Sequence, residues 1–145
     1  MEYKTLSELE RAGEATPAPL TRAERLERWA AALERLGGAR LNTLWRTEHA
    51  VRSVRPTMRA DNSPLSIAFQ DPVLRIAGLA DDSYGEAKRF FELTDYELHW
   101  IVCYCHFGET LSAEAAARQI RAVAGLRQWQ AAGGWLTRMF FGRLV

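Results

Sequence analysis

The sequence predicts an all-α fold, a compact single-domain bundle of about six or seven short helices. Three observations lead to this expectation. The chain has 145 residues, of which 48% are hydrophobic and 26% charged, the usual balance for one globular domain. At four places a serine or threonine is followed three positions later by glutamate, a spacing typical of helix N-termini. Apolar residues then recur at helical spacing, and the one segment with strand-like alternation has no partner strand.

Two prolines separate an N-terminal arm from the rest of the chain. Residues 5–14 fit a short charged helix. Pro17 and Pro19 follow it, and proline breaks a helix because it lacks the donated amide and restricts the residue before it. We therefore expect residues 1–20 to form a loosely held arm and residues 21–145 to form a single helical domain.

The first helix of the domain is expected from Thr21 to about Leu36. Thr21 and Glu24 have the spacing of a capping box, and the glycine pair at 37–38 is suited to end the helix. The apolar residues of this segment form one stripe at helical spacing, which is expected to be buried. They are Leu26, Trp29, Ala30 and Leu33.

The middle of the chain gives weaker patterns. A helix is expected over residues 42–55. Residues 65–69 alternate like a strand, but a lone strand cannot pair, so an extended loop is expected there. Asp71 is placed to cap a short helix that has proline at its first position. Ser83 begins another helix, which runs to about Phe91.

The most informative helix is expected near 94–106, at the centre of the bundle. Leu93 and Leu98 fit a hydrophobic staple around a cap at Thr94. One face of this helix must be core: Leu98, Ile101, Val102 and Cys105. Aromatic residues fall on the roughly opposite side: Trp100, Tyr104 and Phe107. A helix that is apolar on two sides is central in a fold or lies between a core and a partner.

A polar strip between these two faces contains candidate metal ligands. Its members are Asp95, His99, Cys103 and His106. Imidazole and thiolate bind zinc or a similar metal, and spacings of four and three residues place them on one side of a helix. Three ligands on one straight helix seldom close around an ion, so a fourth ligand would come from elsewhere, and Asp95 would orient a ligand by hydrogen bonding. The favoured alternative is that the strip serves packing and hydrogen bonding, and no cofactor is predicted in that case.

Arginines gather in the second quarter of the chain, although the net charge of the whole is only +1. Guanidinium groups bind phosphate in a bidentate manner, so four of them form a candidate anion site. They are Arg46, Arg52, Arg55 and Arg59. No glycine-rich phosphate loop accompanies them. The favoured alternative is ion pairing with residues 61–114, which carry three basic and ten acidic residues.

The C-terminal part of the chain is apolar, aromatic and basic. An alanine-rich helix is expected over residues 112–124 and a final apolar helix near 135–144. The stripe of the final helix includes Trp135, Leu136, Met139 and Phe140. This stripe closes the core, meets a partner or lies in a membrane interface, and Phe141 points away from it as an exposed anchor. The candidate partner surface comprises Trp100, Tyr104, Phe107, Trp135, Met139, Phe140 and Phe141.

The helices expected at 94–106 and 112–124 also have the order of a DNA-binding helix-turn-helix, whose second helix enters the major groove. Arg118 and Arg121 of the second helix suit phosphates or guanine edges. A nucleic-acid-binding regulator is therefore an alternative, but it is not favoured because the other basic residues are dispersed along the chain.

These patterns favour a small helical module that acts through protein–protein contacts, including self-association, over an enzyme. The five tryptophans and the many arginines are residue types that dominate interface energetics. No Ser-His-Asp set or dinucleotide fingerprint is recognised. The other alternative is a metal-dependent enzyme or metal sensor that uses the histidine–cysteine strip.

The sequence also bears on location. No apolar run approaches the ~18 residues of a transmembrane segment. The two cysteines lie two positions apart, so on a helix they point in nearly opposite directions and cannot bond to each other. Reduced thiols and a cytoplasmic location are therefore expected.

Overall fold

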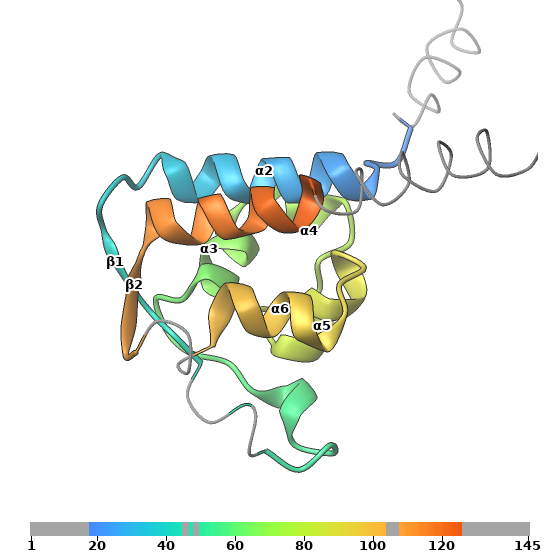
Figure 1. Cartoon of the computed structure of the whole chain (residues 1–145). Helices are drawn as coiled ribbons and strands as arrows, with labels where there is room; N and C mark the ends of the chain where they lie inside the picture. The colour runs from blue at the N-terminus through green and yellow to red at the C-terminus, as the bar shows by residue number, and fades with distance from the viewer. Residues whose placement is uncertain (1–17, 45–46, 48–49, 104–107, 126–145) are drawn as a thin grey trace, which may run out of the picture.

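The protein is a mostly helical domain with a small two-stranded sheet (Figure 1). This computed structural model describes residues 18–44, 47, 50–103 and 108–125. The helices are α2 (Arg22–Glu34), the 3-10 helix η2 (Arg55–Thr57), α3 (Pro64–Gln70), α4 (Pro72–Ile76), α5 (Tyr84–Phe90), α6 (Asp95–Val102) and a last described helix over 113–125. The strands are β1 (Arg40–Asn42) and β2 (Thr110–Ser112).

Two long helices form one side of the domain. α2 and the helix over 113–125 run antiparallel beside each other, while α5 and α6 lie below them in Figure 1. α3 and α4 pack against α2, and α5 packs against both α6 and η2. Each of the two long helices is connected to the sheet. A turn joins the end of α2 to β1, and the helix over 113–125 follows β2 directly.

The sheet corrects the expectation of a purely helical fold. β1 and β2 pair antiparallel, with Leu41 opposite Leu111 at the centre of the register. Each strand has only three residues, too few to show an alternating pattern. The strands are also paired across about 70 positions of the chain, so no local signal in the sequence connects them.

Two further segments differ from their predictions. The helix expected over residues 42–55 is wrong: β1 ends at Asn42, and residues 52–54 form turns before η2. The extended loop expected over 65–69 is a helix, α3. Ser63 caps this helix by accepting from the amide of Ser66, while the Ser66 hydroxyl accepts from the amide of Ser63. The second serine takes the place of the glutamate of a capping box, so the sequence lacks the usual pattern of a helix start at this position.

The predicted helix near 94–106 is shorter than expected, because α6 ends at Val102. The next residue, Cys103, has an extended backbone with φ −91° and ψ 144°. It forms a parallel bridge with Leu44, whose amide donates to the carbonyl of Val102 at 2.8 Å. The backbone of Cys103 thus pairs with Leu44, a residue far away in the sequence, and does not continue the helix.

Helix starts were predicted more accurately than helix ends. The reciprocal hydrogen bonds of the capping box are present at Thr21 with Glu24 and at Thr94 with Glu97. Ser83 accepts from the amide of Glu86 as expected, but the Glu86 carboxylate accepts from the amide of Ala80 instead. The cap by Asp71 with proline at the first position of α4 is confirmed.

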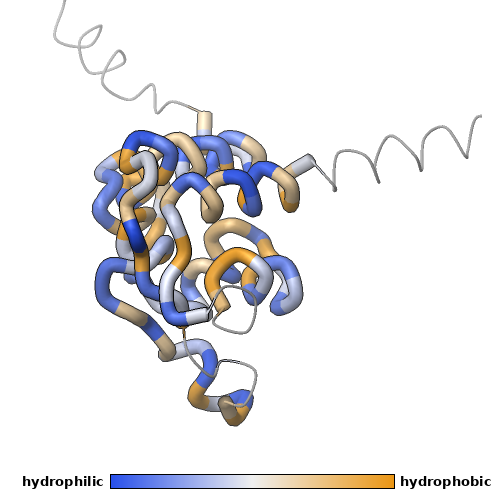
Figure 2. The backbone as a smooth tube through the Cα atoms, turned by 60° about the vertical axis from the view of Figure 1, so that its left-hand side comes forward, coloured by the Kyte–Doolittle hydropathy of each residue, from blue (hydrophilic) through white to orange (hydrophobic). Residues whose placement is uncertain are grey.

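The core lies between α2 on one side and α5 and α6 on the other. Leu98, Ile101 and Val102 are fully buried, which confirms the inner face predicted for this helix. Trp29 of α2 is also fully buried, and its indole stacks on Phe91 with 4.4 Å between ring centroids. Hydrophobic and hydrophilic stretches alternate along the tube of Figure 2, which agrees with one buried face for each helix.

Several predictions fall outside the described residues. These are the N-terminal arm up to residue 17, the final helix near 135–144, and the side chains of Cys105 and of the aromatic residues at 104 and 107. Among the residues that the structure does describe, no helix is long and apolar enough to cross a membrane.

Truncation of Ile101 tests the inner face of α6. We expect Ile101→Ala to lower the free energy of unfolding by about 2–5 kcal/mol, the range for deleting a buried aliphatic side chain. Ile76→Ala is the control, because this isoleucine is 87% exposed, and its effect should stay within about 0.5 kcal/mol. Urea unfolding measures both. Equal effects of the two substitutions would contradict the packing described here.

Asp71 gives the fold a predictable pH dependence. Its carboxylate accepts from Arg28 Nε at 2.7 Å and from the amide of Val73 at 2.9 Å. Burial alone would raise the pKa of Asp71, but these hydrogen bonds and the charge of Arg28 outweigh burial and lower the pKa below its ordinary 3.8. A carboxyl group with a lowered pKa in the folded state adds stability above its unfolded-state pKa and loses it as the pH falls further.

Asp71→Asn should therefore lower the free energy of unfolding at pH 7 by about 1–3 kcal/mol, the cost of losing a hydrogen bond between charged groups. The difference between the variant and the native protein should shrink as the pH falls below 3.8. Urea unfolding at a series of pH values checks this. A difference that persists unchanged at pH 2.5 would show that the charge of Asp71 is not its cause.

Candidate functional site

The predicted histidine–cysteine strip does not form on one helix. His99 is half-buried in the last turn of α6, whereas Cys103 lies beyond the end of the helix and is fully buried. The Sγ atom of Cys103 lies 2.6 Å from the hydroxyl oxygen of Thr47. Because Cys103 has left the helical path, helical spacing no longer places it beside His99.

The metal hypothesis itself stays untested. His106 lies outside the described residues, and Asp95 faces Lys88, whose Nζ donates to its carboxylate at 2.9 Å. Within the described ranges, no three side chains of the His, Cys, Asp and Glu types are grouped so that they could hold a metal ion. The fold therefore adds no argument for a metal centre.

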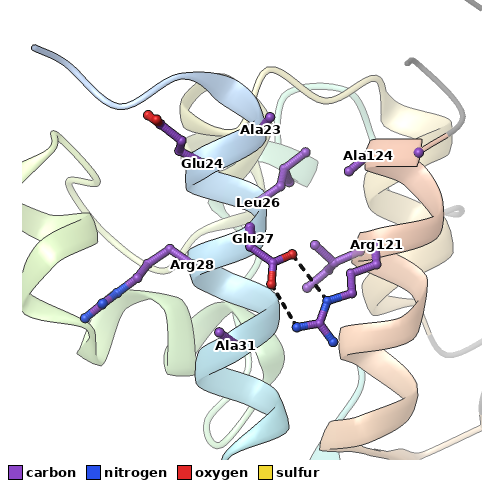
Figure 3. A pocket seen from close by; sticks show the side chains of 10 residues that line it. Ala23, Glu24, Leu26, Glu27, Arg28, Ala31, Arg121 and Ala124 are labelled. Atoms are coloured by element: carbon purple, nitrogen blue, oxygen red, sulfur yellow. Dashed lines mark hydrogen bonds and ion pairs between the residues drawn. The ribbon is translucent and has the colours of Figure 1, made fainter. Parts of the chain in front are cut away.

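A hollow lies between α2 and the helix over 113–125, and we call it the interhelix groove (Figure 3). Its volume is about 650 Å³. Its lining residues extend from Ala23 to Ala31 on α2 and from Ile120 to Gly125 on the facing helix. The buried Leu26 and Ile120 contribute to its lining, and most of the lining is apolar.

An ion pair joins the two walls of this groove. Arg121 donates from Nη2 to Glu27 at 2.9 Å, and the same nitrogen lies 2.7 Å from a carboxylate oxygen of Glu34. These hydrogen bonds raise the pKa of Arg121 and lower that of Glu27. Figure 3 shows Ala23, Leu26 and Ala124 on one side of the pair, so the apolar part of the groove continues toward the start of α2.

The arginines singled out in the sequence have separate environments. Arg59 pairs with Asp81 at 3.8 Å and with Asp82 at 3.5 Å, so for this residue the ion pairing with the acidic segment is confirmed. Arg55 donates from Nε to the carbonyl of Thr47 at 2.9 Å. Arg52 is exposed, and Arg46 lies outside the described residues.

Two of these arginines line a second hollow of about 350 Å³, which we call the polar pocket. Its lining residues are Arg52, Arg55, Pro56, Tyr84, Gly85, Lys88 and Asp95. They come from the segment that contains η2, from α5 and from the first residue of α6. The pocket thus joins two arginines of the predicted anion site to Asp95, which the sequence had placed in the metal strip.

Asp95 organises one side of the polar pocket. It accepts from Lys88, and the Tyr84 hydroxyl donates to its backbone carbonyl at 3.1 Å. The hydrogen bond from Lys88 lowers the pKa of Asp95, although burial opposes this shift. The charges of Lys88 and Arg55 and the hydrogen bond from Tyr84 also lower the pKa of Asp95. Burial raises the pKa of Tyr84, as does the charge of Asp95. Asp95 is therefore an anion and Tyr84 a neutral hydroxyl at neutral pH.

Sequence reasoning missed Lys88 and Tyr84 in this pocket. They lie about 30 positions beyond the arginines, and only the packing of α5 on η2 brings them close. The nearest available signal was Gly85, whose lack of a side chain lets α5 approach Pro56 closely. A lone glycine inside a helix often marks such close packing.

The candidate partner surface is only partly described. Trp100 is half-buried and stacks on the exposed Tyr96, with 6.5 Å between ring centroids. The remaining members lie outside the described residues: Tyr104, Phe107, Trp135, Met139, Phe140 and Phe141.

The arrangement also differs from a helix-turn-helix. α6 ends at Val102 and the next described helix begins at residue 113, with β2 between them, whereas a helix-turn-helix joins its helices by a short turn. Arg121, one of the two arginines proposed to face DNA, is paired with Glu27 and Glu34. Arg118 remains exposed.

Comparison of the chain with models of protein families, with curated proteins and with solved structures gives no match in any of the three. The groove and the pocket are therefore interpreted from their own residues.

Gly85→Ala tests how the polar pocket is held together. A Cβ atom at this position would lie 2.7 Å from Pro56 Cβ and 3.0 Å from the Pro56 carbonyl oxygen. Neither atom is at the end of a flexible side chain, so α5 and η2 must separate, and we expect a loss of about 1–3 kcal/mol in the free energy of unfolding. Gly38→Ala is the control, because nothing lies within 4 Å of its Cβ position. Thermal unfolding measures both variants. Equal losses of stability in Gly85→Ala and Gly38→Ala would refute this close packing.

Proposed function

We propose that the protein is a small binding module that self-associates, and that its interhelix groove receives the apolar C-terminal segment of a second copy. The observation that carries this proposal is the groove itself. It offers about 650 Å³ of mostly apolar space between two helices, with the buried Leu26 and Ile120 in its lining. A hydrophobic groove between helices is a common docking site for an amphipathic helix.

The groove and the C-terminal segment are complementary in size. Ala23, Ala31, Ala124 and Gly125 line the groove with side chains too small to fill it. The stripe predicted near 135–144 consists of large apolar residues, Trp135, Leu136, Met139 and Phe140. Large side chains entering gaps between small ones give the dense packing that stabilises helix contacts.

The path of the chain supports the same occupant. Gly125 lines the groove, and the 20 residues over 126–145 follow it directly in the sequence. Two copies that exchange this segment form a symmetric interface with two occupied grooves. Two docked segments would both contribute to the interface, and a stable interface buries about 1,200–2,000 Å² in total.

We also propose a cytoplasmic location for this module. Cys103 has a buried thiol group that is not part of a disulfide. Reduced thiols are the usual state of cysteine in the cytoplasm.

Light scattering of the full chain over a range of concentrations tests the proposal. We expect a dimer at high concentration, and we expect Ala124→Arg to raise the dissociation constant at least tenfold, because the groove would then hold a charged side chain. Ala122→Arg is the matched control on the same helix, since Ala122 is exposed and does not line the groove. If Ala124→Arg unfolds the protein, Ala23→Arg makes the same test at an exposed position.

Variants of the segment complete the test. Phe140→Ser should weaken association, whereas Arg138→Ser, which lies off the predicted stripe and outside the candidate partner surface, should change it little. A chain that stays monomeric at every concentration would refute the proposal. This outcome includes the case in which the C-terminal segment fills the groove of its own chain. Equal weakening by Phe140→Ser and Arg138→Ser would also refute it, because association would then not depend on the predicted stripe.

A further inference from the structure

We propose that the polar pocket binds a small molecule that carries a phosphate monoester, with Arg52, Arg55 and Lys88 as its cationic ligands. Its volume of about 350 Å³ falls within the ~300–1,000 Å³ typical of small-molecule sites. Unlike the interhelix groove, its lining is mostly polar. This inference is independent of the proposed self-association.

The charge of the pocket matches a doubly charged anion. Among the described residues, its lining contains three cations and one carboxylate, Asp95, which together carry a net charge of +2. A phosphate monoester carries a charge of about −1.5 to −2 at neutral pH, because its second pKa is near 6. A phosphodiester carries only one charge and would leave the pocket positive.

Arg55 is held in place for this role. Its Nε donates to the carbonyl of Thr47 at 2.9 Å, and its Nη2 lies 3.4 Å from the carbonyl of Ala50. These two bonds fix the guanidinium plane without neutralising its charge. A fixed guanidinium loses little conformational entropy when it binds an oxyanion through its remaining N–H groups.

The contrast with Arg59 shows that ion pairing does not account for the other two arginines. Arg59 reaches the carboxylates of Asp81 and Asp82, as an arginine that serves only the fold would. Within the described ranges, neither Arg52 nor Arg55 forms an ion pair with a carboxylate. Two positive charges that line one pocket, neither of them in an ion pair with a described carboxylate, favour an anion from outside the chain.

Lys88 and Asp95 complete the site. Asp95 holds Lys88 through the 2.9 Å ion pair, so the ammonium group lies at the pocket and not freely in solvent. An ammonium group has three donors, and one bond to Asp95 leaves two for an oxyanion. The pocket is a single hollow and not an extended track of cations, which favours a small ligand over a polynucleotide backbone.

Calorimetric titration of the full chain with methyl phosphate at pH 7.5 tests the proposal, with dimethyl phosphate as the singly charged comparison. We expect methyl phosphate to bind at least tenfold more tightly than dimethyl phosphate, and we expect its affinity to fall at pH 5, where it loses one charge. Inorganic phosphate should compete with it, since the pocket contacts the phosphate group.

Arg52→Ala should weaken binding of methyl phosphate about tenfold or more. Arg118→Ala is the matched control, because Arg118 is an exposed arginine that does not line the pocket, and its loss changes the net charge equally. Lys88→Gln is a second variant that keeps a polar side chain. Equal losses in Arg52→Ala and Arg118→Ala, or equal affinities for the two esters, would overturn the proposal. So would a single-stranded oligonucleotide that binds more tightly than methyl phosphate and depends on Arg52.

Discussion

The placement of Trp29 determines how the helices of this domain meet. Its ring stacks on Phe91 at the end of α5, and its indole nitrogen donates to the carbonyl of Pro64 in α3 at 2.8 Å. A buried indole needs a partner for its N–H group, so this hydrogen bond allows the largest side chain of the core to be fully buried. One residue of α2 thus fixes the positions of two other helices. The opposite side of α2 is then left to form the interhelix groove.

Polar residues at helix ends place the second hollow. Arg22 of α2 bonds to the carbonyl of Glu92 and to the carboxylate of Glu97, which also completes the cap of α6. These contacts hold the junction of α5 and α6 against the start of α2. Lys88 near the end of α5 and Asp95 at the start of α6 are therefore brought together at the polar pocket. The junction of α5 and α6 thus closes the core on one side and presents Lys88 and Asp95 on the other.

Features decided by neighbouring residues could be predicted from the sequence, and features decided by distant contacts could not. The starts of α2 and α6 follow from Thr21 and Thr94, whose capping partners lie three positions away. The end of α6 depends on Leu44, which lies more than 50 positions earlier in the sequence. The apolar periodicity of the segment does not reveal this contact, so it predicts a helix that extends beyond Val102. Arg52 and Arg55 could be singled out because arginines cluster in the sequence, whereas Lys88 joins them only through the packing of α5 on η2.

The two-stranded sheet also bears on how this chain folds. Pairing β1 with β2 closes a loop of about 70 residues, and the entropy lost on closure grows with loop length. Contacts of such separation slow folding, and the bond between Arg22 of α2 and Glu97 of α6 spans a similar separation of 75 positions. The helix over 113–125 follows β2 directly, so its docking on α2 is coupled to the pairing of the strands. Hydrogen exchange of its amides would then report the lifetime of one wall of the groove, and any molecule bound there would lengthen it.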